Sequence, residues 1–255
     1  MKDIKAFFFD IDGTLCDRSN RISFSTQKAL KSLKQKEYLL FLSSGRPMRS
    51  MKLFFDENDL DFDGYIYLNG QCGSYQGKDV RNVYLPEDEV RNALGFILEH
   101  RIQTNIHVDK ETVTALDGDE HRVYQIPLCD FSKLNYSHIH QISVMLPEGE
   151  MLEEVKKIMK SCEVTRWSRD GVDIILAGSG KIEGMKAILD SCGLSFQQVI
   201  SFGDSENDVE MLKLSKVGIA MGNAMEVCKI ASDYVTDDMY HDGIFNALKH
   251  FGFLE

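Results

Sequence analysis

The fold of this chain is decided by the stretch Ala6-Phe-Phe-Phe-Asp-Ile-Asp-Gly-Thr-Leu15. Its apolar first half is typical of a buried parallel strand, and it ends in two carboxylates, Asp10 and Asp12. In an open α/β sheet, ligands bind beyond the carboxyl ends of the strands. On a continuing strand, two residues apart, both carboxylates are expected on the same side. They repel each other unless a cation lies between them or one is protonated. A hard divalent cation such as Mg2+ fits the first case, and a strand that ends in an acidic turn is the plainer alternative.

The composition is that of an ordinary globular protein, and it narrows the classes of partner. The chain has 255 residues, of which 43% are hydrophobic and 27% charged, enough for one large domain or two ordinary ones. Its net charge of −11 disfavours nucleic acids and anionic membranes, which require a basic face. Six scattered cysteines without a Cys-x-x-Cys pair predict free thiols in a reducing compartment. Because no apolar stretch is long enough to span a membrane, we expect a cytoplasmic protein.

Strands and helices alternate at both ends of the chain, and this alternation predicts a parallel sheet with right-handed crossovers. Apolar patterning places the first of these elements at 5–9, 25–35, 38–42, 47–55 and 65–68. The pattern resumes with a helix at 181–191 and a strand at 199–202. Between the two parts, it predicts strands and helices of an antiparallel α+β insert at 82–85, 86–100, 103–108, 138–146, 148–161, 164–167 and 172–176.

A second acidic cluster follows the second apolar strand, Val199–Phe202. Asp204 and Asp208 lie four residues apart across a turn into a helix, where both can face the edge that carries Asp10 and Asp12. Acidic residues are common at helix N-termini because of the helix dipole. Two such clusters after two apolar strands nevertheless favour a metal site.

Ser44 and Lys181 are candidates for binding phosphate. Ser44 ends a strand beside Gly45, near a helix start, so its hydroxyl and the neighbouring backbone N–H groups can hold phosphate oxygens; an ordinary N-cap serine is the alternative. Lys181 begins a helix, where the dipole disfavours a lysine, so we expect it to neutralise phosphate and the carboxylates. Arg46 can pair with an aspartate or substrate, or form a surface salt bridge.

Together these motifs resemble those of the haloacid dehalogenase superfamily. They occur in that family's order as Asp10-Ile-Asp12-Gly13-Thr-Leu, Ser44-Gly45-Arg46, Lys181 and Gly203-Asp204-Ser-Glu-Asn207-Asp208. The insert and the Asn69-Gly70 turn before it resemble the Cof-type sugar-phosphatase branch, which carries a large α/β cap of the C2B type. The resemblance implies the α/β fold class, with a Rossmann-like core at residues 1–84 and 179–255 and an inserted α+β cap domain at 85–178.

The resemblance also implies a role for each motif residue. Asp10 would be the nucleophile that forms an aspartyl-phosphate, and Asp12 the general acid and then the base. Asp10, the backbone carbonyl of Asp12, and Asp204 would hold Mg2+, with Asp208 supporting it directly or through water. The residues expected to bind the phosphoryl group or substrate are Gly13, Ser44, Gly45, Arg46, Asn69, Lys181 and Asn207.

These observations predict a Mg2+-dependent phosphomonoester hydrolase that acts on sugar phosphates or similar small phosphorylated metabolites. Two alternatives stay open: a phosphomutase that returns the phosphoryl group to the sugar, and a sugar-phosphate sensor without catalysis. The presence of both Asp10 and Asp12 disfavours the sensor. In the insert, His107, His138 and His140 are expected on strands, without the ligand spacing of a metal site. His138 and His140 share a face, which is expected to be solvated; a face turned toward the substrate is the alternative.

Overall fold

The computed structural model describes residues 3–17, 19–58 and 60–254, and the chain divides into two compact units. The core unit comprises Met1–Arg46, Ser50–Arg81 and Lys181–Glu255, and the inserted unit comprises Pro47–Arg49 and Asn82–Gly180. The division falls after residues 81 and 180, whereas the sequence places it after residues 84 and 178. Residues 1–2, 18, 59 and 255 of the predicted core lie outside the described part.

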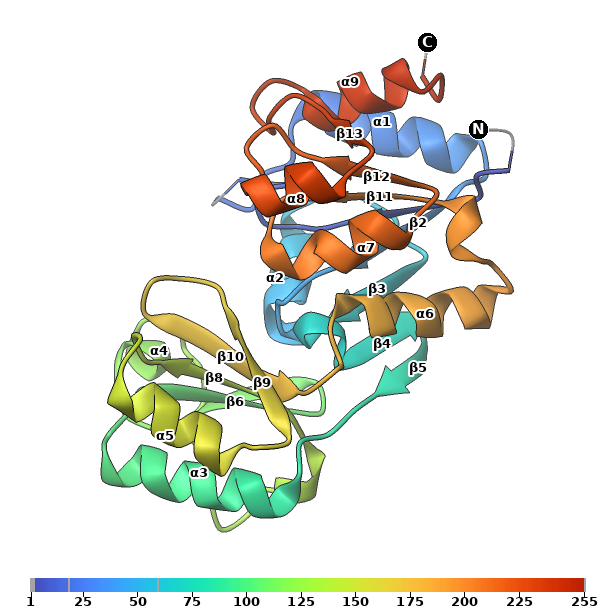
Figure 1. Cartoon of the computed structure of the whole chain (residues 1–255). Coiled ribbons are helices and arrows are strands. Elements are labelled where there is room, and N and C mark those ends of the chain that lie inside the picture. The colour runs from blue at the N-terminus through green and yellow to red at the C-terminus, as the bar shows by residue number, and fades with distance from the viewer. Residues whose placement is uncertain (1–2, 18, 59, 255) are drawn as a thin grey trace. The chain divides into compact units, whose positions relative to one another are not determined.

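Within the described residues, an eight-stranded sheet forms the centre of the core unit (Figure 1). Its order is β13-β12-β11-β1-β2-β3-β4-β5, and neighbours from β13 to β3 are parallel. These strands are β1 (Ala6–Phe9), β2 (Leu39–Ser43), β3 (Gly64–Tyr67), β11 (Val199–Gly203), β12 (Val217–Ala220) and β13 (Tyr234–Val235). The antiparallel β4 (Cys72–Tyr75) and then β5 (Lys78–Asn82) complete one side.

Helices cover both faces of this sheet. Successive residues of the central strand β1 point to opposite faces, and all of them are apolar, so both faces must be covered. Phe8 belongs to a cluster with Met185 and Met211, on helices α6 (Lys181–Cys192) and α7 (Val209–Leu214). Phe7 contacts Phe253, just beyond α9 (Gly243–His250). The helices of this part are α1 (Phe24–Gln35), α2 (Met48–Glu57), α6 (Lys181–Cys192), α7 (Val209–Leu214), α8 (Glu226–Ala231) and α9 (Gly243–His250). The parallel sheet between helices confirms the predicted α/β fold class.

The inserted unit is an antiparallel sheet in the order β7-β6-β8-β10-β9. Its strands are β6 (Thr104–Val108), β7 (Glu111–Thr114), β8 (Ile139–Met145), β9 (Cys162–Arg166) and β10 (Gly171–Leu176). Its helices are α3 (Glu87–Glu99), α4 (Asp119–Arg122) and α5 (Glu150–Ile158). One face of the sheet is apolar, and residues such as Ile106, Ile142 and Ile174 form a core with Leu94 of α3 and Leu152 of α5.

Two local predictions were wrong, one for the edge of the core sheet and one for the inserted unit. The strand expected at 82–85 lies instead at Lys78–Asn82, where it forms a hairpin with β4 around Gly77, whose φ is +75°. His140 is buried rather than solvated, and His107 is buried as well, because neighbouring groups cover them; the ring of Tyr84, for example, stacks on His140. His107 contacts Thr112 Oγ1 at 3.0 Å and Ser143 Oγ at 2.9 Å. Burial, with His140 nearby, lowers the pKa of His107 to about 3.

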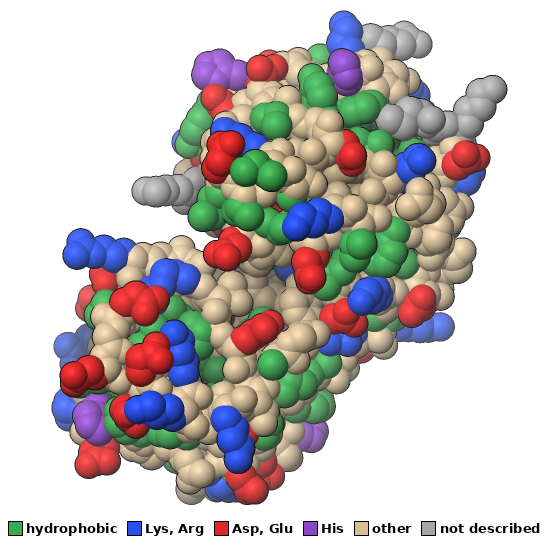
Figure 2. Space-filling view, in the orientation of Figure 1, with side chains coloured by type: hydrophobic (Ala, Val, Ile, Leu, Met, Phe, Trp, Pro, Cys, Tyr) green, Lys and Arg blue, Asp and Glu red, His purple; other side chains and the backbone are tan. Residues whose placement is uncertain are grey.

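Further sequence predictions concern thiols, membranes and surface charge. All six cysteines are free, as predicted. Among the helices in the described ranges, none combines the length and the apolar character needed to cross a membrane. The face drawn in Figure 2 carries acidic and basic side chains interspersed with hydrophobic ones.

Candidate active site

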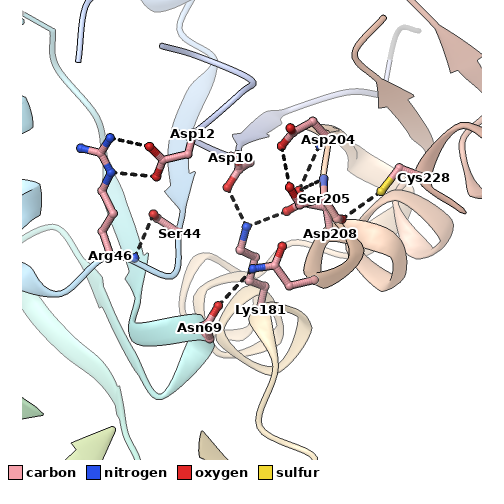
Figure 3. A network of polar contacts seen from close by, with 11 residues as sticks. Asp10, Asp12, Ser44, Arg46, Asn69, Lys181, Asp204, Ser205, Asp208 and Cys228 are labelled. Carbon is pink, nitrogen blue, oxygen red and sulfur yellow. Dashed lines mark hydrogen bonds and ion pairs between the residues drawn. The ribbon is translucent and has the colours of Figure 1, made fainter. Parts of the chain in front are cut away.

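The candidate site lies in the core unit, beyond the carboxyl ends of four adjacent strands (Figure 3). The strands β11, β1, β2 and β3 are neighbours in the sheet and run parallel. Their carboxyl ends therefore place Asp204, Asp10, Ser44 and Asn69 at one edge, which is where open α/β sheets bind ligands. Helix α6 adds Lys181, its first residue.

Lys181 lies within a buried acidic cluster. Its Nζ is 2.6 Å from Asp10 Oδ1 and 2.7 Å from Asp208 Oδ1. The side chains of Lys181, Asp10 and Asp208 are 1%, 6% and 0% exposed. Such short, desolvated ion pairs hold the carboxylates in fixed positions. Lys181 therefore links the two acidic motifs that the sequence places almost two hundred residues apart.

Asp208 shapes the loop that carries Asp204. Its second oxygen, Oδ2, accepts hydrogen bonds of 3.1 Å from the backbone N–H groups of Asp204 and Ser205. The side chain of Ser205 donates in turn to Asp204 Oδ1 at 3.1 Å. Both oxygens of Asp208 thus accept hydrogen bonds within the protein, so Asp208 supports the loop of Asp204 while Oδ1 keeps a lone pair that a cation can use.

The cluster could hold a metal ion. Asp10, Asp204 and Asp208 each offer an oxygen, and these oxygens lie within 4.8 Å of one another. Three carboxylates and one ammonium leave two negative charges (−3 + 1 = −2), and this excess matches one divalent cation. All the donors are oxygens, which suit a hard cation such as Mg2+. The residues present therefore fit the expected metal.

The electrostatics of the cluster support the same conclusion. Burial raises the pKa of Asp10 well above its usual value, and Lys181 offsets only part of the rise. Burial, together with the charge of Asp208, raises the pKa of Asp204 to about 6. Burial by itself lowers the pKa of Lys181, but Asp10 and Asp208 outweigh it and leave that pKa raised. Lys181 thus stays charged, but its single positive charge does not balance the carboxylates around it, as expected where a cation binds.

Asp12 turns away from Asp10, and the prediction that both side chains lie on one side was wrong. Strand β1 ends at Phe9, so the alternation of a continuing strand does not apply. Arg46 binds Asp12 through both carboxylate oxygens, at 2.8 Å from Nε to Oδ2 and 2.6 Å from Nη2 to Oδ1. Figure 3 shows Asp12 directed toward Arg46, and Asp10 toward Lys181. Of the pairings considered for Arg46, the structure shows the one with an aspartate.

The other predicted ligands lie in the surrounding loops. Ser44 Oγ accepts a 3.1 Å hydrogen bond from the Arg46 N–H. Gly13 has a φ of +85°, and a Cβ there would lie 2.3 Å from Asp204 Oδ2, so only glycine leaves room for that carboxylate. Asn207 Nδ2 donates to Asn69 Oδ1 at 3.1 Å. The structure thus brings Asn69 and Asn207 into contact with each other.

Sequence reasoning missed two supports of this site. Asn223 Nδ2 donates to the carbonyl of Gly13 at 2.8 Å, and the thiol of Cys228 donates to the carbonyl of Ser205 at 2.9 Å. Asn223 follows the apolar strand β12, which ends at the same sheet edge. Its place just after an apolar strand could have identified Asn223 as a residue of the site, whereas no local pattern identifies Cys228.

Comparisons with known proteins place this geometry in context. A family model described as haloacid dehalogenase-like hydrolase matches residues 7–248. The putative phosphatase YkrA of Bacillus subtilis (strain 168) is 28% identical over 261 residues, which span 99% of this chain and 100% of YkrA. YcsE of the same organism, a 5-amino-6-(5-phospho-D-ribitylamino)uracil phosphatase, is 26% identical over 97% of this chain and 96% of its own.

Solved structures give the same result. The subclass IIB sugar phosphatase BT4131 of the haloacid dehalogenase superfamily superimposes with a TM-score of 0.86 at 30% identity, covering 98% of this chain and 100% of that chain. BT1666 from Bacteroides thetaiotaomicron, a phosphatase of the same superfamily, gives a TM-score of 0.85 at 26% identity, over 98% and 96% of the two chains.

Proposed function

This chain belongs to the haloacid dehalogenase-like hydrolases and is a phosphatase of the Cof type, and we propose that it hydrolyses monoesters of sugar phosphates or similar small metabolites. The observation that carries the proposal is the buried contact of Lys181 with Asp10 and Asp208, beside Asp204, at the carboxyl edge of the sheet. This arrangement supplies a fixed carboxylate nucleophile and the positive charge that a phosphoryl group requires.

In the proposed reaction, Asp10 attacks phosphorus while Lys181 holds its Oδ1. A bond forms from a carboxylate oxygen to phosphorus, and the bond from phosphorus to the ester oxygen breaks. Asp12 donates a proton to the leaving oxygen and then removes one from the water that hydrolyses the aspartyl-phosphate. Arg46 orients Asp12 through two hydrogen bonds, and one of them must open for Asp12 to take up the proton that it donates. Ser44 and Asn207 are the proposed contacts to the phosphoryl oxygens.

Mg2+ completes the proposed site. Asp10, Asp204 and the carbonyl of Asp12 would hold it, and Asp208 would support Asp204 through the loop between them. When bound, the ion would supply positive charge that stabilises the transferring phosphoryl group. The role of the inserted unit as a cap stays a prediction.

We expect the stabilising effect of Mg2+ to depend on pH. Because the pKa of Asp204 is raised to about 6, the folded protein binds a proton at Asp204 more tightly than the unfolded chain does. This proton binding adds to the free energy of unfolding at low pH, and the contribution is lost as the pH rises from the unfolded pKa through 6. Mg2+ replaces the proton, so it should raise the melting temperature strongly at about pH 7.5 and weakly at about pH 5. Thermal unfolding with and without Mg2+ measures this. Asp190→Asn, an exposed change on α6, should keep the response, and an equal response at both pH values would contradict the prediction.

The proposed function is tested by phosphate release. The assay uses a panel of sugar phosphates and p-nitrophenyl phosphate, with Mg2+ and with a chelator. We expect release that requires Mg2+ and differs among the substrates. Absence of release from every ester in the presence of Mg2+ would overturn the proposal, and isomerised sugar phosphates without net release would indicate a mutase instead.

A further inference from the structure

The turn between β3 and β4 has an unusual backbone. Leu68, Asn69 and Gly70 have consecutive positive φ angles of 51°, 51° and 88°. Glycine adopts this left-handed conformation freely and asparagine tolerates it, whereas it is unfavourable for leucine. Strained backbone that persists must be held by surrounding contacts, and it gathers at functional sites. The contacts of this turn therefore indicate its purpose.

The backbone of the turn is fastened to the loop that carries Ser44. The N–H of Leu68 donates to the carbonyl of Arg46 at 3.1 Å, and the N–H of Asn69 donates to the carbonyl of Ser44 at 3.2 Å. The turn thus fixes the backbone on which Ser44 and Arg46 stand.

The side chain of Asn69 reaches the other loop of the site. Asn69 is 2% exposed, and its Oδ1 accepts the 3.1 Å hydrogen bond from Asn207 Nδ2. A Cβ at Gly45 would lie 2.9 Å from the same Oδ1, so the glycine leaves the space that this amide occupies. Oδ1 of Asn207 is buried and has no hydrogen-bond partner within the described residues. The Asn69 contact is therefore the hydrogen bond that orients the Asn207 amide.

We propose that Asn69 is a positioning residue for the amide of Asn207. By accepting one Nδ2 hydrogen of Asn207, it sets the plane of that amide and leaves the second hydrogen to donate to a phosphoryl oxygen. Its backbone N–H also holds the loop that carries Ser44, the other proposed contact to that group. Asn69 thereby fixes the relative positions of hydrogen-bond donors that come from two different loops. This inference rests on the proposed function, because it takes Asn207 as a contact to the phosphoryl group.

A double-mutant cycle tests the inference. Asn69→Gly removes the acceptor but suits the left-handed backbone, and Asn207→Ala removes the donor. We expect Asn69→Gly to lower kcat/KM about tenfold, as loss of a hydrogen bond that orients a catalytic contact predicts. In the Asn207→Ala background the same change should have little further effect. Gln76→Gly is the matched control, since it removes an exposed amide from another residue with positive φ, 49°.

The outcomes separate this inference from the proposed function. If the wild type releases phosphate but Asn69→Gly is harmless, or costs the same factor in both backgrounds, the inference is wrong and the function stands. If Asn69→Gly no longer folds at the assay temperature, Asn69 maintains the fold rather than the site, and the inference is again overturned. If the wild type shows no turnover, the proposed function fails, and the cycle is measured as affinity for inorganic phosphate by calorimetry.

Discussion

Asn in place of Asp10 is expected to lower phosphate release by about 10^4-fold or more, as removal of a catalytic nucleophile does, while leaving the protein folded. The amide keeps the size of the carboxylate, and its Oδ1 can still accept from Lys181, which lies 2.6 Å away. It cannot attack phosphorus. Because burial raises the pKa of Asp10, the charged form is disfavoured in the metal-free site. The free energy of unfolding without Mg2+ should therefore be unchanged or higher.

This separation of activity from stability is the informative part of the result. Phosphate release with Mg2+ and urea unfolding with a chelator measure the two quantities on the same preparation. Asp190→Asn makes the same chemical change on the exposed surface of α6 and should alter neither. If Asp10→Asn retained activity within about tenfold of the wild type, another group would have to be the nucleophile, because such losses are far larger for a nucleophile.

The positions of the site residues in the fold could be predicted because they depend on local patterns. Apolar runs that end in polar residues mark the ends of β1, β2 and β11, and parallel strands bring such ends to one edge. This was enough to gather Asp10, Ser44 and Asp204. It required no knowledge of which strands are neighbours, because every parallel strand delivers its carboxyl end to the same edge.

The directions of the side chains could not be predicted in the same way. The orientation of Asp12 depends on a strand that ends at Phe9 and a turn in which the N–H groups of Leu15 and Cys16 both donate to the carbonyl of Ile11. The contact between Asn69 and Asn207 joins two loops 138 residues apart. Such contacts arise from tertiary packing, for which a single sequence has no periodic signal.

The misplaced strand at 82–85 has a similar cause. Of its apolar residues, Leu85 is a core residue, but it is buried in the inserted unit, where its N–H donates to the carbonyl of Ile139. The strand that completes the core sheet is the more polar Lys78–Asn82. An edge strand buries less surface and needs fewer apolar residues, so its pattern is weaker than that of the connecting segment.

Lys181→Met is expected to destabilise the metal-free protein by about 3–5 kcal/mol near neutral pH, the usual cost of removing one partner from a buried ion pair. Methionine fills a similar volume but leaves Asp10 and Asp208 buried without their shared ammonium. Lys186→Met is the matched control, because it makes the same change on the same helix in a half-exposed pair with Glu183. That change should cost about 0.5 kcal/mol or less.

Two conditions should reduce the cost of Lys181→Met, each for a stated reason. Asp10 has a raised pKa, and loss of the ammonium raises it further, so a lower pH protonates the carboxyl and removes an unpaired buried charge. Mg2+ replaces part of the lost positive charge, so it should stabilise this variant more than it stabilises Lys186→Met. Urea unfolding at about pH 5 and about pH 7.5, with Mg2+ and with a chelator, measures both effects. If the two lysine variants were equally stable under all four conditions, Lys181 would not be the charge that holds the acidic cluster together.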